Sequence, residues 1–265
     1  MILYPPAKIN LSLRILNKLP SGYHSISSLM QTISLYDELT ISRDKLSGIR
    51  VICRDVSEKE NIVYKSAVQL QKLLNVNTGA VIKLKKNIPK GAGLGGGSAD
   101  AAYTIIGLLK LWKKTVPEKK LIQFMAQLGA DVPFFYYGGC CIAEGIGEKL
   151  IPVTPTWRKK PLHILLINPG IHVPTKKVYE LWDKSNIHDK QVPLNAFEPV
   201  VFNLYPELFK LKQKLSKLEN VKFVSMSGSG SSFYAVFMNK QDSVKAGRKL
   251  TLPETYKKWV LTTVF

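Results

Sequence analysis

A glycine-rich stretch followed directly by an apolar run constrains the fold of this chain more than any other feature. Five of the seven residues from Gly91 to Gly97 are glycine, and the apolar run predicts a helix from Ser98 to about Trp112. Glycine can adopt positive φ angles and approach a ligand closely, while a helix N-terminus offers free N–H groups and a positive dipole end. The stretch predicts a phosphate-binding loop, and a tight turn with close helix packing is the alternative. Ser98 is placed either to cap the helix or to ligate a phosphate-bound Mg²⁺.

Three better-known nucleotide loops do not fit this stretch. Gly91, Gly93 and Gly96 formally match the dinucleotide fingerprint, but two residues separate them from the preceding strand, and Glu118 begins a lysine-rich helix instead of ending a strand. No Gly-Lys-Ser/Thr run follows, which excludes the Walker pattern. The loop of protein kinases needs a hairpin strand after its glycines, whereas a helix is expected here.

Alternation and helical spacing predict a chain of mixed helices and strands. In the strand expected at residues 7–15, apolar residues alternate with a polar face formed by Lys8, Asn10, Ser12 and Arg14. Further strands are expected at residues 28–42, 80–86, 162–170 and 257–265, and a strand, glycine turn and strand at 222–238. Helices are expected at residues 60–74, 98–112, 117–129, 174–182, 206–220 and 241–250.

Some of these helices carry more specific signals. Pro117 is expected at the start of its helix and Gly129 as its C-cap. In the helix at 206–220 a stripe of leucines should face the core: Leu208, Leu211, Leu215 and Leu218.

Prolines and charges cluster at residues 153–161, which predicts a domain boundary there. The expected domains are residues 1–157, a larger α/β or α+β domain, and residues 158–265, a compact α+β sandwich.

Length and composition limit the classes of protein to which this chain can belong. The 265 residues suffice for one large or two modest domains, and the longest apolar runs are too short to cross a bilayer. The N-terminus has no signal-peptide pattern, so we expect a cytoplasmic protein without a membrane partner. The three cysteines, Cys53, Cys140 and Cys141, lack metal-ligand spacing and are expected to be buried reduced thiols.

The formal net charge of +19 suits polyanionic partners. Its lysines and arginines are spread along the chain, and the longest basic cluster is the three residues 158–160. We therefore expect a solvated surface that steers anionic small substrates, and no nucleic-acid partner. A non-enzymatic RNA-binding protein is the rival interpretation.

The run PKGAGLGGGSADAA, residues 89–102, resembles the phosphate-loop motif of the GHMP small-molecule kinases. The triple glycine before Ser98 resembles the branch of that family whose substrate carries a cytidine diphosphate group. The resemblance extends through residues 7–39, 128–135, 173–182 and 227–237, in the family's order. The first of these blocks contains the Gly-Tyr-His run at 22–24, which other members of the superfamily lack.

The resemblance implies an α+β (α/β two-layer) GHMP kinase fold. Its N-terminal, ATP-binding domain resembles a ribosomal-protein fold, and its C-terminal, substrate domain is ferredoxin-like, with ATP and substrate meeting in the cleft between them. The implied reaction moves the γ-phosphoryl group of ATP to the 2-hydroxyl of a cytidine-diphosphate derivative of 2-C-methyl-D-erythritol, a step toward isoprenoid precursors by the non-mevalonate route. Mg²⁺ would bridge the ATP phosphates, with Ser98 as the candidate protein ligand, and the protein would be a monomer or weak homodimer.

The resemblance also assigns site residues. It implies that Asp131 takes the hydroxyl proton and that Lys8 pairs with it, and strand alternation puts Lys8 and Asn10 on one face. Without the resemblance, Asp131 would read as a turn aspartate and Lys8 as a surface lysine. The implied ATP phosphate loop comprises Pro89, Lys90, Gly91, Ala92, Gly93, Leu94, Gly95, Gly96, Gly97, Ser98 and Ala99.

The substrate-binding residues expected are Asn10, Tyr23, His24 and Thr175. Tyr23 and His24 would line a cytidine pocket, although His24 alone could be an ordinary loop histidine and Thr175 a helix cap. The glycine turn at 227–232 would pack against the phosphate cleft, or be only a hairpin turn. The family often carries an Asn-Asp-hydrophobic-Glu-Pro run, but Ala196 replaces the acid here, so no contact is assigned to it. Another GHMP kinase, acting for example on homoserine, should lack the cytidine pocket.

Overall fold

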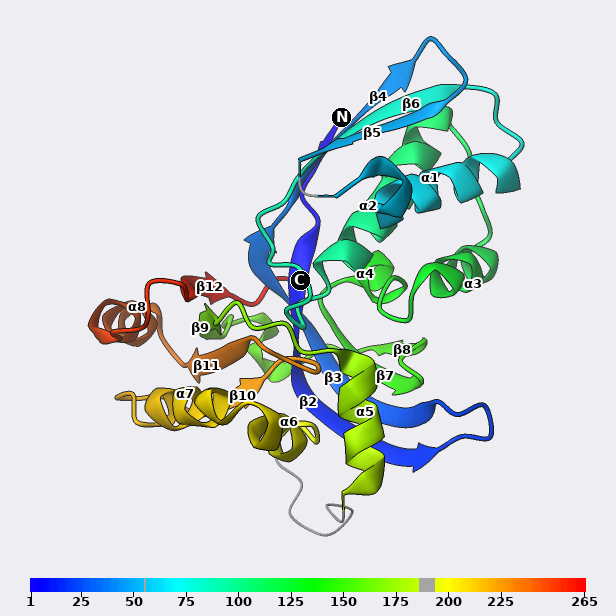
Figure 1. Ribbon diagram of the computed structural model, residues 1–265. Helices are drawn as coiled ribbons and strands as arrows, with labels where there is room; N and C mark the ends of the chain where they lie inside the picture. The colour runs from blue at the N-terminus through cyan, green and yellow to red at the C-terminus, as the bar shows by residue number, and fades with distance from the viewer. Residues whose placement is uncertain (55, 186–193) are drawn as a thin grey trace. The chain divides into compact units, whose positions relative to one another are not determined.

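The computed structural model describes residues 1–54, 56–185 and 194–265 (Figure 1). The chain divides into two compact units, each built from several segments. The first unit comprises Met1–Ala7, Leu35–Ile88 and Gly95–Gly138; the second comprises Lys8–Ser34, Pro89–Leu94 and Gly139–Phe265. The glycine-rich stretch passes from one unit to the other between Leu94 and Gly95. The domain boundary expected between residues 157 and 158 stays a prediction.

The first unit is a sheet covered by helices (Figure 1). Its strands, in the order β1-β4-β6-β5, are β1 (Ile2–Leu3), β4 (Glu38–Asp44), β6 (Gly79–Lys85) and β5 (Ile49–Cys53). Its helices are η1 (Glu58–Glu60), α1 (Ile62–Leu73), α2 (Gly96–Trp112), α3 (Glu118–Leu128) and α4 (Phe134–Tyr137). In β6 the alternation buries Ala80, Ile82 and Leu84 and exposes Lys83 and Lys85, as the sequence predicts.

Particular side chains explain where these helices lie. Asn61 caps α1 by accepting the Val63 N–H at 3.0 Å. Pro117 precedes α3 and Gly129 is its C-cap residue, which confirms both predicted ends. Gly107 brings α2 close to β4, because a Cβ atom there would lie 2.4 Å from Ile41 Cδ1.

A second sheet, mostly in the second unit, contains β2 (Pro6–Lys18), β3 (His24–Tyr36), β7 (Cys140–Gly145) and β8 (Lys149–Pro152) in that order. The extended structure expected at residues 28–42 is confirmed, but it forms two strands, because β3 ends at Tyr36 and β4 begins at Glu38. The residue between them, Asp37, accepts backbone N–H groups of Asn87 and Ile88 at 2.5 and 2.8 Å. These two hydrogen bonds hold Asp37 in place between the strands.

The third sheet, with the order β10-β11-β9-β12, is antiparallel throughout. Its strands are β9 (His163–Asn168), β10 (Phe223–Met226), β11 (Phe233–Phe237) and β12 (Lys257–Thr262). Its helices are α5 (Thr175–Lys184), α6 (Glu198–Leu204), α7 (Pro206–Ser216) and α8 (Lys240–Lys249), after a short η2 (Thr156–Arg158). A strand, helices, two strands, a helix and a strand follow one another along the chain, which is the expected ferredoxin-like order (Figure 1).

One apolar core joins this sheet to its helices. Leu165 and Phe233 from the sheet pack in one cluster with Trp182 of α5 and with α6 and α7. Three leucines of the predicted stripe, Leu208, Leu211 and Leu215, are buried there. The fourth, Leu218, lies beyond the end of α7 and is only partly buried against the same core, so its place in the helix was wrongly predicted.

Among the described residues, no helix has the length and apolar character needed to cross a membrane. The side chains of Cys140 and Cys141 are buried, and burial raises the pKa of the two thiols to about 12 and about 11. Cys53 is only half-buried, contrary to the expectation for all three.

Candidate active site

The glycine loop (residues 89–99) has the backbone that the sequence predicts for an anion cradle. Gly91, Gly93 and Gly95 have φ angles of 59°, 75° and 68°, a left-handed region that favours glycine. Helix α2 begins at Gly96, two residues earlier than expected, so the alternative that Ser98 caps the helix is wrong. Within the described chain no side chain caps this end of α2. Its first N–H groups therefore remain available to an anion.

The glycines of this loop differ in how much space their surroundings leave for a side chain. A Cβ atom on Gly93 would lie 2.0 Å from the backbone oxygen of Ser227, a distance that no real side chain occupies. A Cβ atom on Gly97 would meet nothing nearer than Ile62 Cγ2 at 3.8 Å. Gly93 is thus required by the protein's own packing, whereas the space at Gly97 is left open.

The neighbour of Gly93 is the serine-glycine turn (residues 227–232) between β10 and β11. Ser227 Oγ donates to the Gly93 carbonyl at 2.8 Å, and the Asn10 N–H donates to the same Oγ at 3.3 Å. The Ser232 N–H donates to the Ala92 carbonyl at 3.4 Å. The turn therefore packs on the glycine loop, and the phosphate cleft that the resemblance implies beside it stays a prediction.

Lys8 and Asn10 are joined on β2. Lys8 Nζ donates to Asn10 Oδ1 at 2.8 Å, and Asn10 Nδ2 donates to Ser28 Oγ at 2.8 Å. The Lys8 N–H also donates to the Leu94 carbonyl of the glycine loop at 2.9 Å. Both side chains are buried, at 4% exposure each, so this end of the predicted polar face does not meet solvent. A buried ammonium group needs such partners to offset its desolvation.

His24 begins β3 and is fixed by an aspartate that the sequence did not single out. Its ring stacks on Tyr179 with centroids 4.9 Å apart, and its Nε2 lies 2.5 Å from Asp183 Oδ1. Lys18 Nζ donates to the other carboxylate oxygen at 2.5 Å. The hydrogen bonds from Lys18 and His24 lower the pKa of Asp183. The neighbouring Tyr23 is 63% exposed.

Thr175 and Asp131 lie at the ends of helices. Thr175 is the first residue of α5, after Pro174 at the cap position, so the capping alternative for Thr175 is wrong. Its Oγ1 lies 2.6 Å from Ser229 Oγ of the serine-glycine turn. Asp131 belongs to the first unit and is half-buried in the turn between α3 and α4. Its assignment as a base stays a prediction.

The first unit contains a buried charge cluster that sequence reasoning missed. Lys86 Nζ donates to Asp100 Oδ2 at 2.6 Å and also to Asp37 Oδ2. Burial raises the pKa of Asp100 to about 7 against the opposing effect of Lys86, while its Oδ1 has no hydrogen-bond partner among the described residues. Burial alone would lower the pKa of Lys86, but the two carboxylates outweigh it and raise that pKa. Lys86 Nζ would lie 3.3 Å from a Cβ atom on Gly96, so the cluster lies against the first turn of α2.

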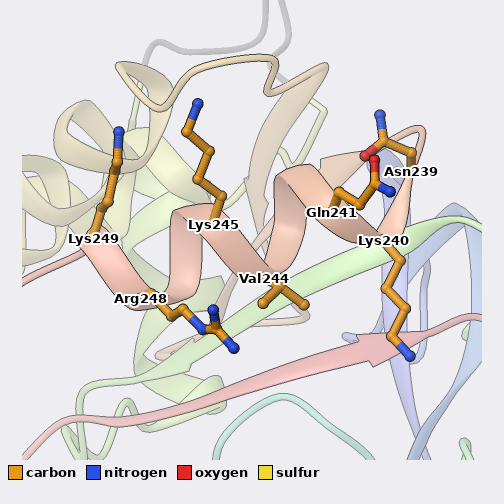
Figure 2. A pocket seen from close by; sticks show the side chains of 7 residues that line it. All are labelled: Asn239, Lys240, Gln241, Val244, Lys245, Arg248 and Lys249. Carbon is orange, nitrogen blue, oxygen red and sulfur yellow. The ribbon is translucent and has the colours of Figure 1, made fainter.

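A surface depression of about 790 Å³ lies on α8, and the residues that line it include none of the predicted site residues. Figure 2 shows that its cations diverge: Lys240 and Arg248 extend to one side of the helix, and Lys245 and Lys249 to the other. Lys245 also pairs with Glu219 at 2.9 Å. These side chains do not converge on one ligand.

Comparisons with known proteins identify the family of the chain. A family model described as the GHMP kinases N terminal domain matches residues 61–139, and one described as GHMP kinases C terminal matches residues 184–255. The chain therefore belongs to the GHMP kinases, and the predicted fold is confirmed.

Individual relatives narrow the family further. A protein of Francisella tularensis subsp. tularensis (strain FSC 198), named 4-diphosphocytidyl-2-C-methyl-D-erythritol kinase, is 38% identical over 98% of this chain and 95% of its own length. A crystal structure of 4-(cytidine 5'-diphospho)-2C-methyl-D-erythritol kinase has a TM-score of 0.87 and 31% identity, over 99% of both chains. The chain belongs to the 4-diphosphocytidyl-2-C-methyl-D-erythritol kinase family, so the predicted enzyme class, a small-molecule kinase with an alcohol acceptor, is also confirmed.

Mevalonate kinase of Methanococcus jannaschii is similar in fold alone, with a TM-score of 0.77, 13% identity, and coverage of 100% of this chain and 98% of that one. The shared fold therefore does not identify the substrate of a GHMP kinase. The relatives of higher identity do, because their names specify one substrate.

Proposed function

We propose that this chain transfers the γ-phosphoryl group of ATP to the 2-hydroxyl of 4-diphosphocytidyl-2-C-methyl-D-erythritol, in the non-mevalonate route to isoprenoid precursors. The observation that carries the proposal is the glycine loop, whose left-handed glycines lead into the uncapped N-terminus of α2. Backbone N–H groups and the helix dipole there favour the phosphates of ATP without a lysine after the glycines.

Mg²⁺ is proposed to bind through the ATP phosphates and to neutralise charge on them. The described residues contain no group of three histidine, cysteine or carboxylate side chains that would hold a metal on their own. The hydroxyl of Ser98, in the first turn of α2, is an oxygen ligand of the kind that Mg²⁺ prefers. Ser98 is therefore the candidate protein ligand.

Asp131 is proposed to accept the proton of the substrate hydroxyl, and Lys8 to stabilise the negative charge that develops. Asn10 supports the role of Lys8, because its amide oxygen accepts from Lys8 Nζ at 2.8 Å and orients the ammonium group. Phosphoryl transfer needs little more than such positioning and charge compensation.

Tyr23, His24 and Thr175 are proposed to bind the substrate. The exposed ring of Tyr23 can stack on cytosine, which is worth roughly 1–3 kcal/mol. If Nε2 of His24 donates to Asp183, Nδ1 is left as an acceptor for a ligand N–H group. We further propose that the enzyme is cytoplasmic, a monomer or weak homodimer, and without nucleic-acid or membrane partners.

The proposal is tested by measuring ADP release with 4-diphosphocytidyl-2-C-methyl-D-erythritol, homoserine and mevalonate as separate acceptors. Turnover of the cytidyl compound alone is expected, because only that substrate uses the His24 region. Turnover of homoserine without the cytidyl compound would overturn the substrate assignment. Tight, salt-sensitive RNA binding without ADP release would support the RNA-binding rival instead.

A further inference from the structure

The run at residues 195–199, to which the sequence assigns no ligand contact, buries two polar side chains. Asn195 is 0% exposed and Glu198 is 1% exposed. Buried polar and charged groups are costly unless each is fully hydrogen-bonded. The side chains of both residues form most of their hydrogen bonds with β10 and the serine-glycine turn.

Asn195 brackets Ser227. Its Nδ2 donates to the Met226 carbonyl at 2.8 Å and to the Gly228 carbonyl at 2.7 Å, the residues immediately before and after Ser227. Its Oδ1 accepts the Phe197 N–H at 2.9 Å, which fixes the orientation of the amide. One side chain thus holds the backbone on both sides of the serine.

Glu198 fixes the strand that leads into the turn. Its Oε1 accepts from the Met226 N–H at 2.9 Å and from Ser225 Oγ at 3.1 Å. Its Oε2 pairs with Lys212 Nζ of α7. The charge of this carboxylate is therefore balanced by Lys212, and the carboxylate holds the end of β10. Asn195 holds the backbone from the same end of β10 into the turn.

The serine held in this way supports the glycine loop. Ser227 Oγ donates to the Gly93 carbonyl at 2.8 Å and accepts from the Asn10 N–H at 3.3 Å. A Cβ atom on Gly93 would lie 2.0 Å from the Ser227 oxygen, so the two backbones are in direct contact. Because the two residues touch, a displacement of Ser227 would shift Gly93 directly.

We propose that Asn195 and Glu198 are positioning residues, which hold Ser227 where it supports Gly93 and so preorganise the glycine loop for the ATP phosphates. The proposal rests on the ATP-binding role proposed above. The acidic residue that Ala196 replaces is not needed for it, because the flanking asparagine and glutamate make the contacts.

The test measures the dissociation constant of a nonhydrolysable ATP analogue with Mg²⁺ by calorimetry on the full chain. Asn195→Asp loses the donors but keeps the oxygen, and is expected to bind at least about fivefold more weakly, the equivalent of roughly one lost hydrogen bond. Ser227→Ala should show a similar loss. The double variant should bind no more than about twofold more weakly than either single variant, since both changes remove the same support.

Two further variants separate positioning from general stability. Glu198→Gln keeps an oxygen acceptor and should bind within about twofold of wild type, whereas Glu198→Ala should bind at least about fivefold more weakly. Val201→Ala, in the core side of α6, should lower the melting temperature and leave the dissociation constant unchanged.

The inference is overturned if folded Asn195→Asp binds like wild type, if the two losses multiply in the double variant, or if Val201→Ala weakens binding equally. Failure of the wild-type chain to bind the analogue would instead refute the proposed function. The two failures are therefore distinguishable.

Discussion

Gly93→Ala should damage folding and ATP binding together, because the packing at this residue leaves no room for a methyl group. Its Cβ atom would lie 2.0 Å from the Ser227 oxygen, whereas ordinary contacts begin at 3.4 Å, so the turn must move by roughly 1.4 Å. Such a shift would break the 2.8 Å hydrogen bond from Ser227 Oγ to the Gly93 carbonyl. Alanine must also adopt the left-handed φ of 75°.

The free-energy cost follows from these two effects. A left-handed alanine costs about 1–2 kcal/mol and one lost hydrogen bond about 1 kcal/mol, so the free energy of unfolding should fall by about 2–3 kcal/mol. Urea unfolding measures this loss. Calorimetry with the ATP analogue measures the accompanying loss of affinity, which should be at least about tenfold, since the loop cannot keep its shape.

Gly97→Ala is the matched control for folding. Its Cβ atom meets nothing nearer than 3.8 Å, and the residue is helical, so its free energy of unfolding should be unchanged or raised by up to about 1 kcal/mol. Gly93→Ala with a free energy of unfolding within about 0.5 kcal/mol of wild type and unchanged affinity would refute the reasoning.

Asp131→Asn should lower kcat by about 10²–10⁴-fold with the affinity for ATP within about twofold of wild type, and full activity would remove Asp131 from the base role. Asp183→Asn should raise KM for the cytidyl substrate by about tenfold while KM for ATP stays constant; equal changes in both would contradict its role in orienting His24. Burial raises the pKa of Asp100 from 3.8 to about 7, so the folded state holds that proton more tightly and loses stability as the pH rises through this window. The stability of Asp100→Asn relative to wild type should therefore increase by about 2 kcal/mol between pH 5 and pH 7, and a constant difference in urea unfolding would show that Asp100 does not titrate there.

Local patterns in the sequence predicted much of the fold because they report local physics. The period-2 pattern around Lys8 and Asn10 found β2, and the leucine spacing of residues 208–215 found α7. At one boundary that the sequence did not predict, a distant contact was the reason. Asp37 interrupts the strand expected at 28–42 because it accepts N–H groups from residues 50 and 51 positions away.

Some features of the candidate site could likewise be predicted from local sequence, and others could not. The glycine loop was visible because glycine tolerates positive φ, and three closely spaced positions, Gly91, Gly93 and Gly95, require it. The partners of His24 and Ser227 were not visible: Asp183 is 159 positions from His24, and Gly93 is 134 positions from Ser227. No periodicity connects such residues, so only the folded chain reveals which of many aspartates or glycines is the neighbour.

By itself the sequence determined the glycine loop, the order of helices and strands, and the kinase family, since each depends on residue types at short spacing. Tertiary structure alone decided that Lys8 and Asn10 are buried as a pair, that Lys86 lies between Asp37 and Asp100, and that Asn195 holds the turn beneath Gly93. The physical reason is that burial changes what a polar residue must do. In water each of these groups is satisfied by solvent, but inside the protein each needs a specific partner, which only the fold supplies.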